Sequence, residues 1–456
     1  MFSCTYSVII DAVPDTAAIT INGSHAVSGQ AVTVSQNKIT VEAEQEGYEA
    51  YSAQYKITPG KHNRYTITLS KKRFPIHIHC DNGSSTVIVS GREMGSTPLD
   101  CMLEYGVHTI TLRREGYADE LCHIKVTHEA SYIFHHHAEA TSLIALGIFP
   151  CGSQPKQVLF SLDDEYILIP LLDERGFDVF SVEELRVVQR IEPPDPTGQT
   201  GYPEGLFIKE HNVFLISQMT TGNIYEYSWP ELAYKRTLKT GGVWSKFLAW
   251  HAGKNIVAVS NWLSNTVSIL NLETGSIINR IPTAPVPRGL AFTPSGSNLV
   301  VTSFEGGRIS LYDTNTWKEI KHIYSSGSNM RHAVLSPDGT VLYVSDMGKS
   351  CVYEIDMATF TITHTYHVDD NPNTIDISPD GKLLIVSSRG PNNPTSYLLR
   401  SPRSGYITII DTGTRTIRAS FMGGNQPTGL DISNNGRYLC FSNFRDNTIE
   451  LFYIGE

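Results

Sequence analysis

Basic and aromatic side chains recur at matching positions of a repeated segment that begins near residue 150, and their types suit the recognition of anions. Arg288 and Arg331 follow the residue that opens the segment, while Trp262 and Phe304 follow an apolar strand pattern further on. Guanidinium groups pair bidentately with carboxylate or phosphate, and aromatic rings stack on planar groups. If the segments close into a ring, such residues gather at one rim although they lie far apart in the sequence.

Matching positions in the repeated segments give a set of candidate ligand-binding residues at one rim of the expected central channel. They are Lys156, Glu204, Trp244, Lys246, Arg288, Arg331, His332, Asn373, Arg389 and Arg445. The positions after the second strands add Asp173, Arg175, Trp262, Phe304, Met347, Lys349 and Phe444. The alternative is structural, because an arginine at the start of a repeat can also bond a carbonyl or carboxylate of the neighbouring unit.

Catalytic motifs with a local signature are missing from the sequence. It has no G-x-S-x-G elbow, no H-E-x-x-H, no P-loop and no G-x-G-x-x-G. We therefore predict no catalytic residue and no cofactor, although an enzyme that assembles its site from separate repeats would escape this search. His135-His136-His137 is the one metal candidate considered, but in a strand at most two of these side chains share a face. The sequence predicts a solvated strand end there and no metal site.

The composition favours short strands and several cores. At 456 residues the chain exceeds one ordinary hydrophobic core, and 40% apolar with only 18% charged residues suits an all-β protein. A formal net charge of -10 argues against bulk attraction to nucleic acid or to an anionic membrane. No stretch approaches the roughly 18 to 20 apolar residues that span a bilayer, so no integral membrane segment is predicted.

An internal repeat dominates the chain from about residue 150. The repeat opens at Pro155, Pro203, Trp244, Pro287, Met330, Pro372 and Pro427. A turn such as Ser336-Pro337-Asp338-Gly339 joins its first two strands, and the second strand reads Leu342-Tyr343-Val344-Ser345-Asp346 in the same unit. These units resemble the YVTN family of propeller repeats over residues 141–456. The resemblance implies a seven-bladed β-propeller.

The two ends of the repeat region complement one another. The last unit stops after its third strand at Leu451-Phe452-Tyr453-Ile454, whereas residues 142–149 form an apolar strand ahead of the first unit. We expect residues 142–149 to close the last blade as its fourth strand, because closure removes free strand edges.

A second, shorter period precedes residue 140. Glu46-Gly47-Tyr48-Glu49 and Glu115-Gly116-Tyr117-Ala118 each follow an alternating apolar and polar run. The second copy, with Gly95-Ser96-Thr97-Pro98-Leu99, resembles the PEGA domain, a small sandwich of bacterial envelope proteins. The first copy departs from that pattern at Ser28-Gly29-Gln30-Ala31. The predicted domains are a degenerate PEGA-like β-sandwich over 1–70, a PEGA-like β-sandwich over 71–140 and the propeller over 141–456.

The N-terminus and the cysteines bear on the compartment. No signal peptide is present in the given sequence, but Phe2-Ser3-Cys4 resembles the tail of a lipoprotein cleavage box, which would make Cys4 a lipid anchor. The alternative is an ordinary N-terminus. Cys80, Cys101 and Cys122 supply either one disulfide in an exported protein or buried thiols.

One repeat carries an insertion between Ser388 and Tyr406. A repeat that tolerates extra residues at one loop often uses them on its binding face. We predict a partner-binding loop with Tyr397, Leu398, Arg400 and Arg403, and the alternative is a passive surface excursion.

Together these features predict a noncatalytic binding protein of the bacterial periplasm or cell envelope. Its expected partners are an envelope protein, peptidoglycan or another glycan, or a small anionic ligand. Resemblance to lactonase propellers leaves a hydrolase of anionic sugar lactones as one alternative. A single-stranded nucleic-acid binder is the other, and the net charge disfavours it.

Overall fold

The chain is all-β, as the composition predicts. The computed structural model describes residues 5–60, 62–80, 83–114, 119–134 and 143–455. Apart from strands, regular structure there consists of two short 3-10 helices, η1 (Lys209–His211) and η2 (Ala252–Lys254). Cys4, His135-His136-His137 and the Glu115–Ala118 turn lie outside the described residues.

The N-terminal residues form two sheets around one core. The first sheet is β4 (Ala31–Val34), β1 (Tyr6–Val13) and β7 (Asn63–Thr68); the second is β3 (Ser24–Ala26), β2 (Ala18–Ile21), β5 (Lys38–Glu44) and β6 (Tyr51–Lys56). Side chains that alternate along the strands, among them Val8, Ile19 and Val41, are buried in this core. The alternation arises because neighbouring side chains of a strand point to opposite faces.

Two further sheets follow along the chain. One is β11 (Leu99–Glu104), β8 (Arg73–Cys80) and β14 (Ala130–Phe134); the other is β10 (Arg92–Ser96), β9 (Thr86–Val89), β12 (Gly106–Arg113) and β13 (Glu120–Val126). Within the described residues no cysteine forms a disulfide bond.

The rest of the chain folds into seven four-stranded antiparallel sheets. The first four, written from inner to outer strand, are β16 (Leu159–Phe160), β17 (Tyr166–Pro170), β18 (Phe177–Ser181) and β19 (Arg186–Ile191); β20 (Gly205–Ile208), β21 (Val213–Gln218), β22 (Asn223–Ser228) and β23 (Tyr234–Lys239); β24 (Ser245–His251), β25 (Ile256–Asn261), β26 (Thr266–Asn271) and β27 (Ile277–Pro282); and β28 (Pro287–Phe292), β29 (Asn298–Ser303), β30 (Arg308–Asp313) and β31 (Glu319–Tyr324).

The remaining three sheets follow the same order. They are β32 (Met330–Leu335), β33 (Val341–Asp346), β34 (Cys351–Asp356) and β35 (Thr361–His367); β36 (Pro372–Ile377), β37 (Leu383–Ser388), β38 (Tyr406–Asp411) and β39 (Thr416–Met422); and β40 (Pro427–Ile432), β41 (Tyr438–Asn443), β42 (Thr448–Ile454) and β15 (Leu143–Pro150). In this last sheet β15 pairs antiparallel with β42, so strands from the two ends of the region lie in one sheet.

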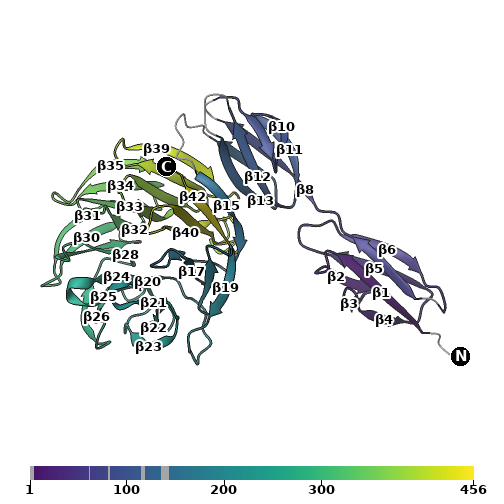
Figure 1. The fold of residues 1–456 in the computed structure, drawn as a ribbon, viewed down its shortest axis with the longest axis horizontal. Coiled ribbons are helices and arrows are strands. Elements are labelled where there is room, and N and C mark those ends of the chain that lie inside the picture. The colour runs from purple at the N-terminus through teal and green to yellow at the C-terminus, as the bar shows by residue number, and fades with distance from the viewer. Residues whose placement is uncertain (1–4, 61, 81–82, 115–118, 135–142, 456) are drawn as a thin grey trace. The chain divides into compact units, whose positions relative to one another are not determined.

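These sheets are arranged around a circle in a propeller-like fold (Figure 1). The inner strands contact one another in sequence from β20 through β24, β28, β32 and β36 to β40, and β40 also contacts β16. Gln157 links the two remaining neighbours, because its Oε1 accepts a 2.6 Å hydrogen bond from the Gly205 amide. Residues that begin the inner strands are thereby brought to one end of a common axis.

Turn chemistry explains why the first two strands of most sheets form a hairpin, while η1 and η2 stand at this place in the other two. In Ser336-Pro337-Asp338-Gly339, the Gly339 amide donates to the Ser336 carbonyl at 2.8 Å and Gly339 has φ 70°. The Ser336 hydroxyl also donates to Asp338 Oδ1 at 2.6 Å. Positive φ carries little cost for glycine, so this residue fixes the turn that sets the strand register.

A repeated hydroxyl hydrogen bond joins six of the seven sheets to the next one. Ser217, Ser260, Thr302, Ser345, Ser387 and Ser442 each donate to a carbonyl at the start of the following inner strand, namely that of Lys246, Arg288, Arg331, Asn373, Thr428 and Pro155. All six hydroxyl residues are buried. These bonds hold in place the backbone that carries the candidate ligand-binding side chains.

Removing one of these hydroxyls tests its contribution to stability. Ser260→Ala leaves the buried Arg288 carbonyl without its 3.0 Å donor and the Phe247 amide without its acceptor. We expect a loss of about 1–3 kcal/mol in the free energy of unfolding, measured by urea denaturation. The control Ser276→Ala alters an exposed hydroxyl and should change stability by about 0.5 kcal/mol or less. Equal stability of the two variants would contradict the prediction.

Candidate functional site

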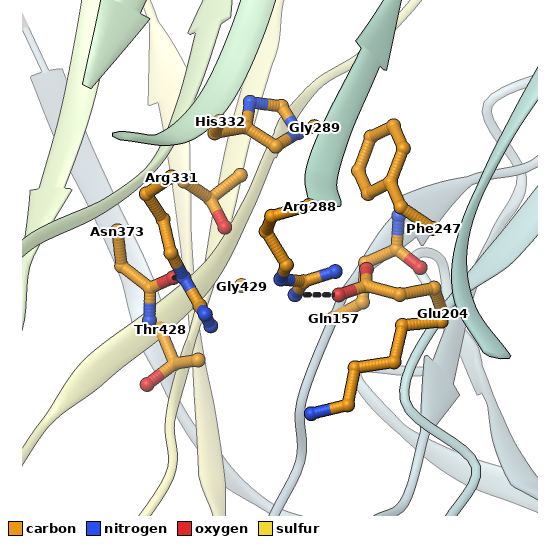
Figure 2. Close-up of polar contacts among 12 residues, drawn as sticks. Gln157, Glu204, Phe247, Arg288, Gly289, Arg331, His332, Asn373, Thr428 and Gly429 are labelled. Carbon is orange, nitrogen blue, oxygen red and sulfur yellow. Dashed lines mark hydrogen bonds and ion pairs between the residues drawn. The ribbon is translucent and has the colours of Figure 1, made fainter. Parts of the chain in front are cut away.

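The starts of the inner strands bring one side chain per sheet toward the propeller axis. We call this set the axial cluster; its members are Lys156, Glu204, Lys246, Arg288, Arg331, Asn373 and Thr428. Figure 2 shows Arg288 pointing toward Glu204, and Arg331 lying beside Asn373. Six of the seven are sequence-predicted site residues, and Thr428 is the addition.

Cations dominate this buried region. Lys156, Lys246, Arg288 and Arg331 are at most 8% exposed, and Glu204 is the one carboxylate of the axial cluster. Burial, together with Arg288 and the buried Arg389 that follows β37, holds the pKa of the Arg331 guanidinium well below its ordinary value. Burial of charge is costly unless each charge is paired, so an excess of cations here calls for compensation.

The internal bonds satisfy only part of this excess. Arg288 Nη2 pairs with Glu204 Oε1, and Arg331 Nε donates to Asn373 Oδ1 at 2.6 Å. Among the described residues, Arg288 Nε and Nη1 and Asn373 Nδ2 are buried without any hydrogen-bond partner. The structural alternative for the arginines thus accounts for some of their donors and leaves others directed at no protein acceptor.

The two lysines of the axial cluster are strongly perturbed. Burial, reinforced by Arg331 and Arg288, holds the pKa of the Lys156 ammonium well below its ordinary value, and Glu204 opposes the shift. Burial and the same two arginines also hold the pKa of Lys246 well below its ordinary value. Both shifts arise because the charged form is disfavoured by desolvation and by like charge. A bound anion would offset the repulsion between like charges and so raise the pKa of both lysines.

The imidazole of His332 and the carboxyl of Glu204, both near the arginines, are each engaged. Burial lowers the pKa of His332 to about 4, opposed by Glu204 and reinforced by Arg288, and His332 Nδ1 accepts the Ile375 amide at 3.5 Å. Burial opposes ionisation of Glu204, but Arg288 and Lys156 outweigh it and lower the pKa of this carboxyl. His332 is therefore a neutral imidazole and Glu204 a carboxylate at neutral pH.

The inserted loop is fastened over Arg389 by a residue that sequence reasoning missed. Gln426, fully buried, accepts from Arg389 Nη2 and donates from Nε2 to the Tyr397 and Leu399 carbonyls at 2.9 and 3.0 Å. Burial lowers the pKa of Arg389 to about 10, and Arg445 nearby acts in the same direction. The position of Gln426 directly before Pro427, which opens a repeat, was the available signal.

Two arginines of that loop serve its attachment, which differs from the partner-binding role expected for them. Arg400 Nη1 pairs with Asp446 Oδ1 at 2.6 Å, and Arg403 Nη2 pairs with Asp369 Oδ1 at 2.5 Å. Both guanidinium groups are therefore already paired with carboxylates of the same chain. Tyr397 and Leu398, in contrast, are 51% and 42% exposed.

Not every predicted position joins the axial cluster. Arg175 Nη1 pairs with Glu192 at 3.0 Å, Lys349 Nζ donates to Ser325 Oγ at 2.6 Å, and Asp173 is exposed. Trp244 lies at the rim and stacks on Trp262, with ring centroids 6.1 Å apart. The structure thus brings six of the predicted residues together at the starts of the inner strands, while Arg175 and Lys349 bind local partners instead.

Backbone conformation at the rim is unusual for the residue types present. The residue before the inner strand has φ 59° in both Trp244 and Val286, and the same left-handed region is used at Gln154, Asn371 and Gln426. For a β-branched residue such as Val286 this conformation is an outlier. Strained backbone is often concentrated at binding sites, where the surrounding structure maintains it.

Close packing of inner strands explains the glycines next to the axial cluster. A Cβ on Gly429 would lie 2.6 Å from Gln157 Cα, so only glycine allows β40 and the chain before β16 to approach. Phe247 occupies the corresponding position in β24, where its ring lies 5.8 Å from Arg288 Cζ and 5.0 Å from the His332 ring. Phe247 is, after Thr428 and Gln426, a third site residue that the sequence reasoning missed.

The described part of the chain holds no cluster of three or more His, Cys, Asp or Glu that could ligate a metal. In the same residues, no helix is long and apolar enough to cross a membrane.

Comparisons with known proteins identify the family. Residues 75–139 match the PEGA domain, as predicted for the second N-terminal module. Antigen Lp49 of Leptospira interrogans serogroup Icterohaemorrhagiae serovar copenhageni (strain Fiocruz L1-130) is 37% identical over 313 residues, which cover 67% of this chain and 68% of the relative. The chain belongs to the Antigen Lp49 family. This Lp49-family chain also resembles a solved structure titled Kuenenia stuttgartiensis hydrazine synthase, with TM-score 0.57, 14% identity and coverage of 66% of this chain and 95% of that one. At that identity the likeness supports the propeller-like fold alone.

Proposed function

We propose that this Lp49-family chain is a noncatalytic binding protein of the bacterial cell envelope, and that its seven four-stranded sheets are the blades of one propeller whose axial cluster binds an anionic ligand. One observation carries the proposal: four buried basic side chains of the cluster share one carboxylate, and buried guanidinium donors of Arg288 have no protein acceptor among the described residues. An anion would supply both the charge and the acceptors.

The engaged acid–base groups favour binding over turnover. Glu204 is held as a carboxylate by Arg288, and His332 already accepts the Ile375 amide. A hydrolase would need a group free to move a proton at the substrate. The axial cluster is therefore better suited to binding an intact ligand than to hydrolysing a lactone.

The envelope location rests on two similarities. The PEGA match covers residues 75–139, and the curated relative is named an antigen. Peptidoglycan fragments and other acidic glycans, small carboxylates and envelope proteins with acidic segments all present the chemistry that the cluster requires. The exposed Tyr397 and Leu398 at the inserted loop would form part of the contact with a larger partner.

Titration with a compact polyanion tests the proposal. Citrate injected into the wild-type protein at low ionic strength should bind, because its carboxylates can reach several cations at once. Arg331→Gln should weaken that binding about tenfold or more, since a charged hydrogen bond contributes about 1.5–3 kcal/mol. The matched control Arg186→Gln removes an exposed arginine of β19 and should leave the affinity unchanged. Failure of citrate, phosphate and sulfate alike to bind the wild type would overturn the proposal.

A further inference from the structure

A row of aromatic rings lies beside the axial cluster. Trp244 and Trp262 stack with an interplanar angle of 13° and centroids 6.1 Å apart, and Trp262 and Phe304 stack at 30° and 5.9 Å. All three side chains are half-buried. They come from two neighbouring sheets, so the row is a composite surface and belongs to neither sheet alone. Large rings left partly open to solvent next to a polar site are characteristic of surfaces that contact a ligand.

Cations of the axial cluster contact these rings directly. Lys246 Nζ lies 3.4 Å from the Trp262 ring centroid and 5.0 Å from that of Trp244, and Arg331 Cζ lies 5.9 Å from that of Phe304. Each of these cations is thus close enough to a ring for one small molecule to contact both. An anion that reaches Lys246 and Arg331 therefore lies beside the rings.

The indole of Trp262 adds a polar feature to the same surface. Its Nε1 is buried and has no hydrogen-bond partner in the described part of the chain. A buried indole N–H normally finds an acceptor. The row therefore combines half-buried rings and one unpaired indole donor with two cations, which is more than a bare inorganic anion can use.

A second group of rings and cations follows the same plan. Phe444 lies 5.7 Å from Lys156 Nζ and 5.5 Å from Arg389 Cζ, and Tyr397 of the inserted loop lies 5.7 Å from Arg389 Cζ. Rings of the β36 and β40 sheets thus lie beside cations, as rings of the β24 and β28 sheets do. The pairing of ring with cation is a general property of this rim.

We infer that the ligand is a ring-bearing polyanion: a molecule with two or more carboxylate or phosphate groups that reach the axial cluster, and a planar or cyclic apolar face that lies on Trp262 and Phe304. This inference rests on the proposed anion-binding function and specifies the class of ligand. Both an acidic sugar and an aromatic carboxylate have this chemistry. An anion without a ring would occupy the cations and leave the aromatic row uncovered.

Three probes of graded structure separate the ring from the charges. Benzene-1,3,5-tricarboxylate has a ring and three carboxylates, citrate has three carboxylates without a ring, and benzoate has a ring with one carboxylate. Calorimetric titration of the wild-type protein should show the tricarboxylate binding about tenfold more tightly than citrate, as expected from one aromatic contact. Benzoate should bind more weakly than either. Glucose 1,6-bisphosphate is the saccharide arm, and tighter binding than the tricarboxylate would identify the ring as a sugar.

Variants assign the preference to the aromatic row. Trp262→Leu and Phe304→Leu should each reduce the preference for the tricarboxylate over citrate to about threefold or less, while citrate affinity stays within about threefold of wild type. Trp317→Leu is the matched control, because Trp317 also accompanies a lysine, with Lys254 Nζ at 6.0 Å, but lies in the turn between β30 and β31. Equal wild-type affinities for citrate and the tricarboxylate would overturn this inference and leave the anion site intact. Failure of both to bind would overturn the proposed function itself.

Discussion

Glu204→Gln is expected to lower the free energy of unfolding by about 3–5 kcal/mol, the cost of breaking a buried ion pair by removing one partner. Glu204 is 4% exposed, its Oε1 pairs with Arg288 Nη2, and it also stabilises the Lys156 ammonium. The neutral amide would leave these cations without a countercharge. Urea or thermal denaturation of the propeller measures the loss.

Two further measurements test the Glu204–Arg288 ion pair: a double-mutant cycle gives its coupling energy, and added citrate tests whether an anion can replace the lost charge. Arg288→Met in the Glu204→Gln background should cost less than Arg288→Met alone, because the lost partner is already absent. Citrate should restore stability to Glu204→Gln more than it stabilises the wild type, since it replaces the missing negative charge. Glu226→Gln is the matched control: Glu226 is 2% exposed and pairs with Arg236 at 2.6 Å outside the axial cluster. Similar rescue of both variants, or additive losses in the cycle, would contradict the prediction.

Binding of an anion is expected to take up protons and to weaken about tenfold for each pH unit above the lowered pKa of each axial lysine. The pKa values of Lys156 and Lys246 are held well below their ordinary value of 10.5 by burial and by neighbouring arginines. An anion favours the charged ammonium, so it raises these pKa values and draws protons from solution. The ligand therefore loses affinity as rising pH removes those protons.

The stability of the unliganded protein should respond to pH in the opposite direction. Between the lowered folded-state pKa and the ordinary value of 10.5, the unfolded lysines bind more protons than the folded ones, so stability rises with pH in that window. Calorimetry in two buffers that differ in ionisation enthalpy measures the proton uptake on binding. Lys246→Met should remove one part of the uptake, whereas Lys209→Met, in η1 away from the axial cluster, should not. Affinity that is independent of pH from neutral to alkaline solution would contradict the prediction.

Repeat register was sufficient to align the starts of the inner strands. Pro287 and Arg288 occupy in one sheet the positions that Met330 and Arg331 occupy in the next, and identical strand lengths place them at equivalent points. The apolar strand that precedes the first repeat was expected in the last sheet, and β15 does pair with β42. A period in the sequence carries this information because each unit folds into the same strands and turns.

Local partners could not be predicted in the same way. The inserted loop has no counterpart in other repeats, so nothing in the pattern indicated that Gln426 would bind the Tyr397 carbonyl or that Arg400 would pair with Asp446. Arg403 was expected to face a partner and instead pairs with Asp369, 34 residues earlier in the chain. Such choices depend on which acceptors the folded loop brings within a few ångströms.

The sequence by itself determined the all-β class, the position of the turns and the residue type at each point of the rim, because strand period, turn residues and repeat register are local properties. Only the tertiary structure decided how those residues combine. Closing the ring brings Arg288 to Glu204 across 84 residues of sequence and Arg331 to Asn373 across 42. Burial then changes the chemistry, because cations that would be solvated on an open surface are excluded from water and share one carboxylate.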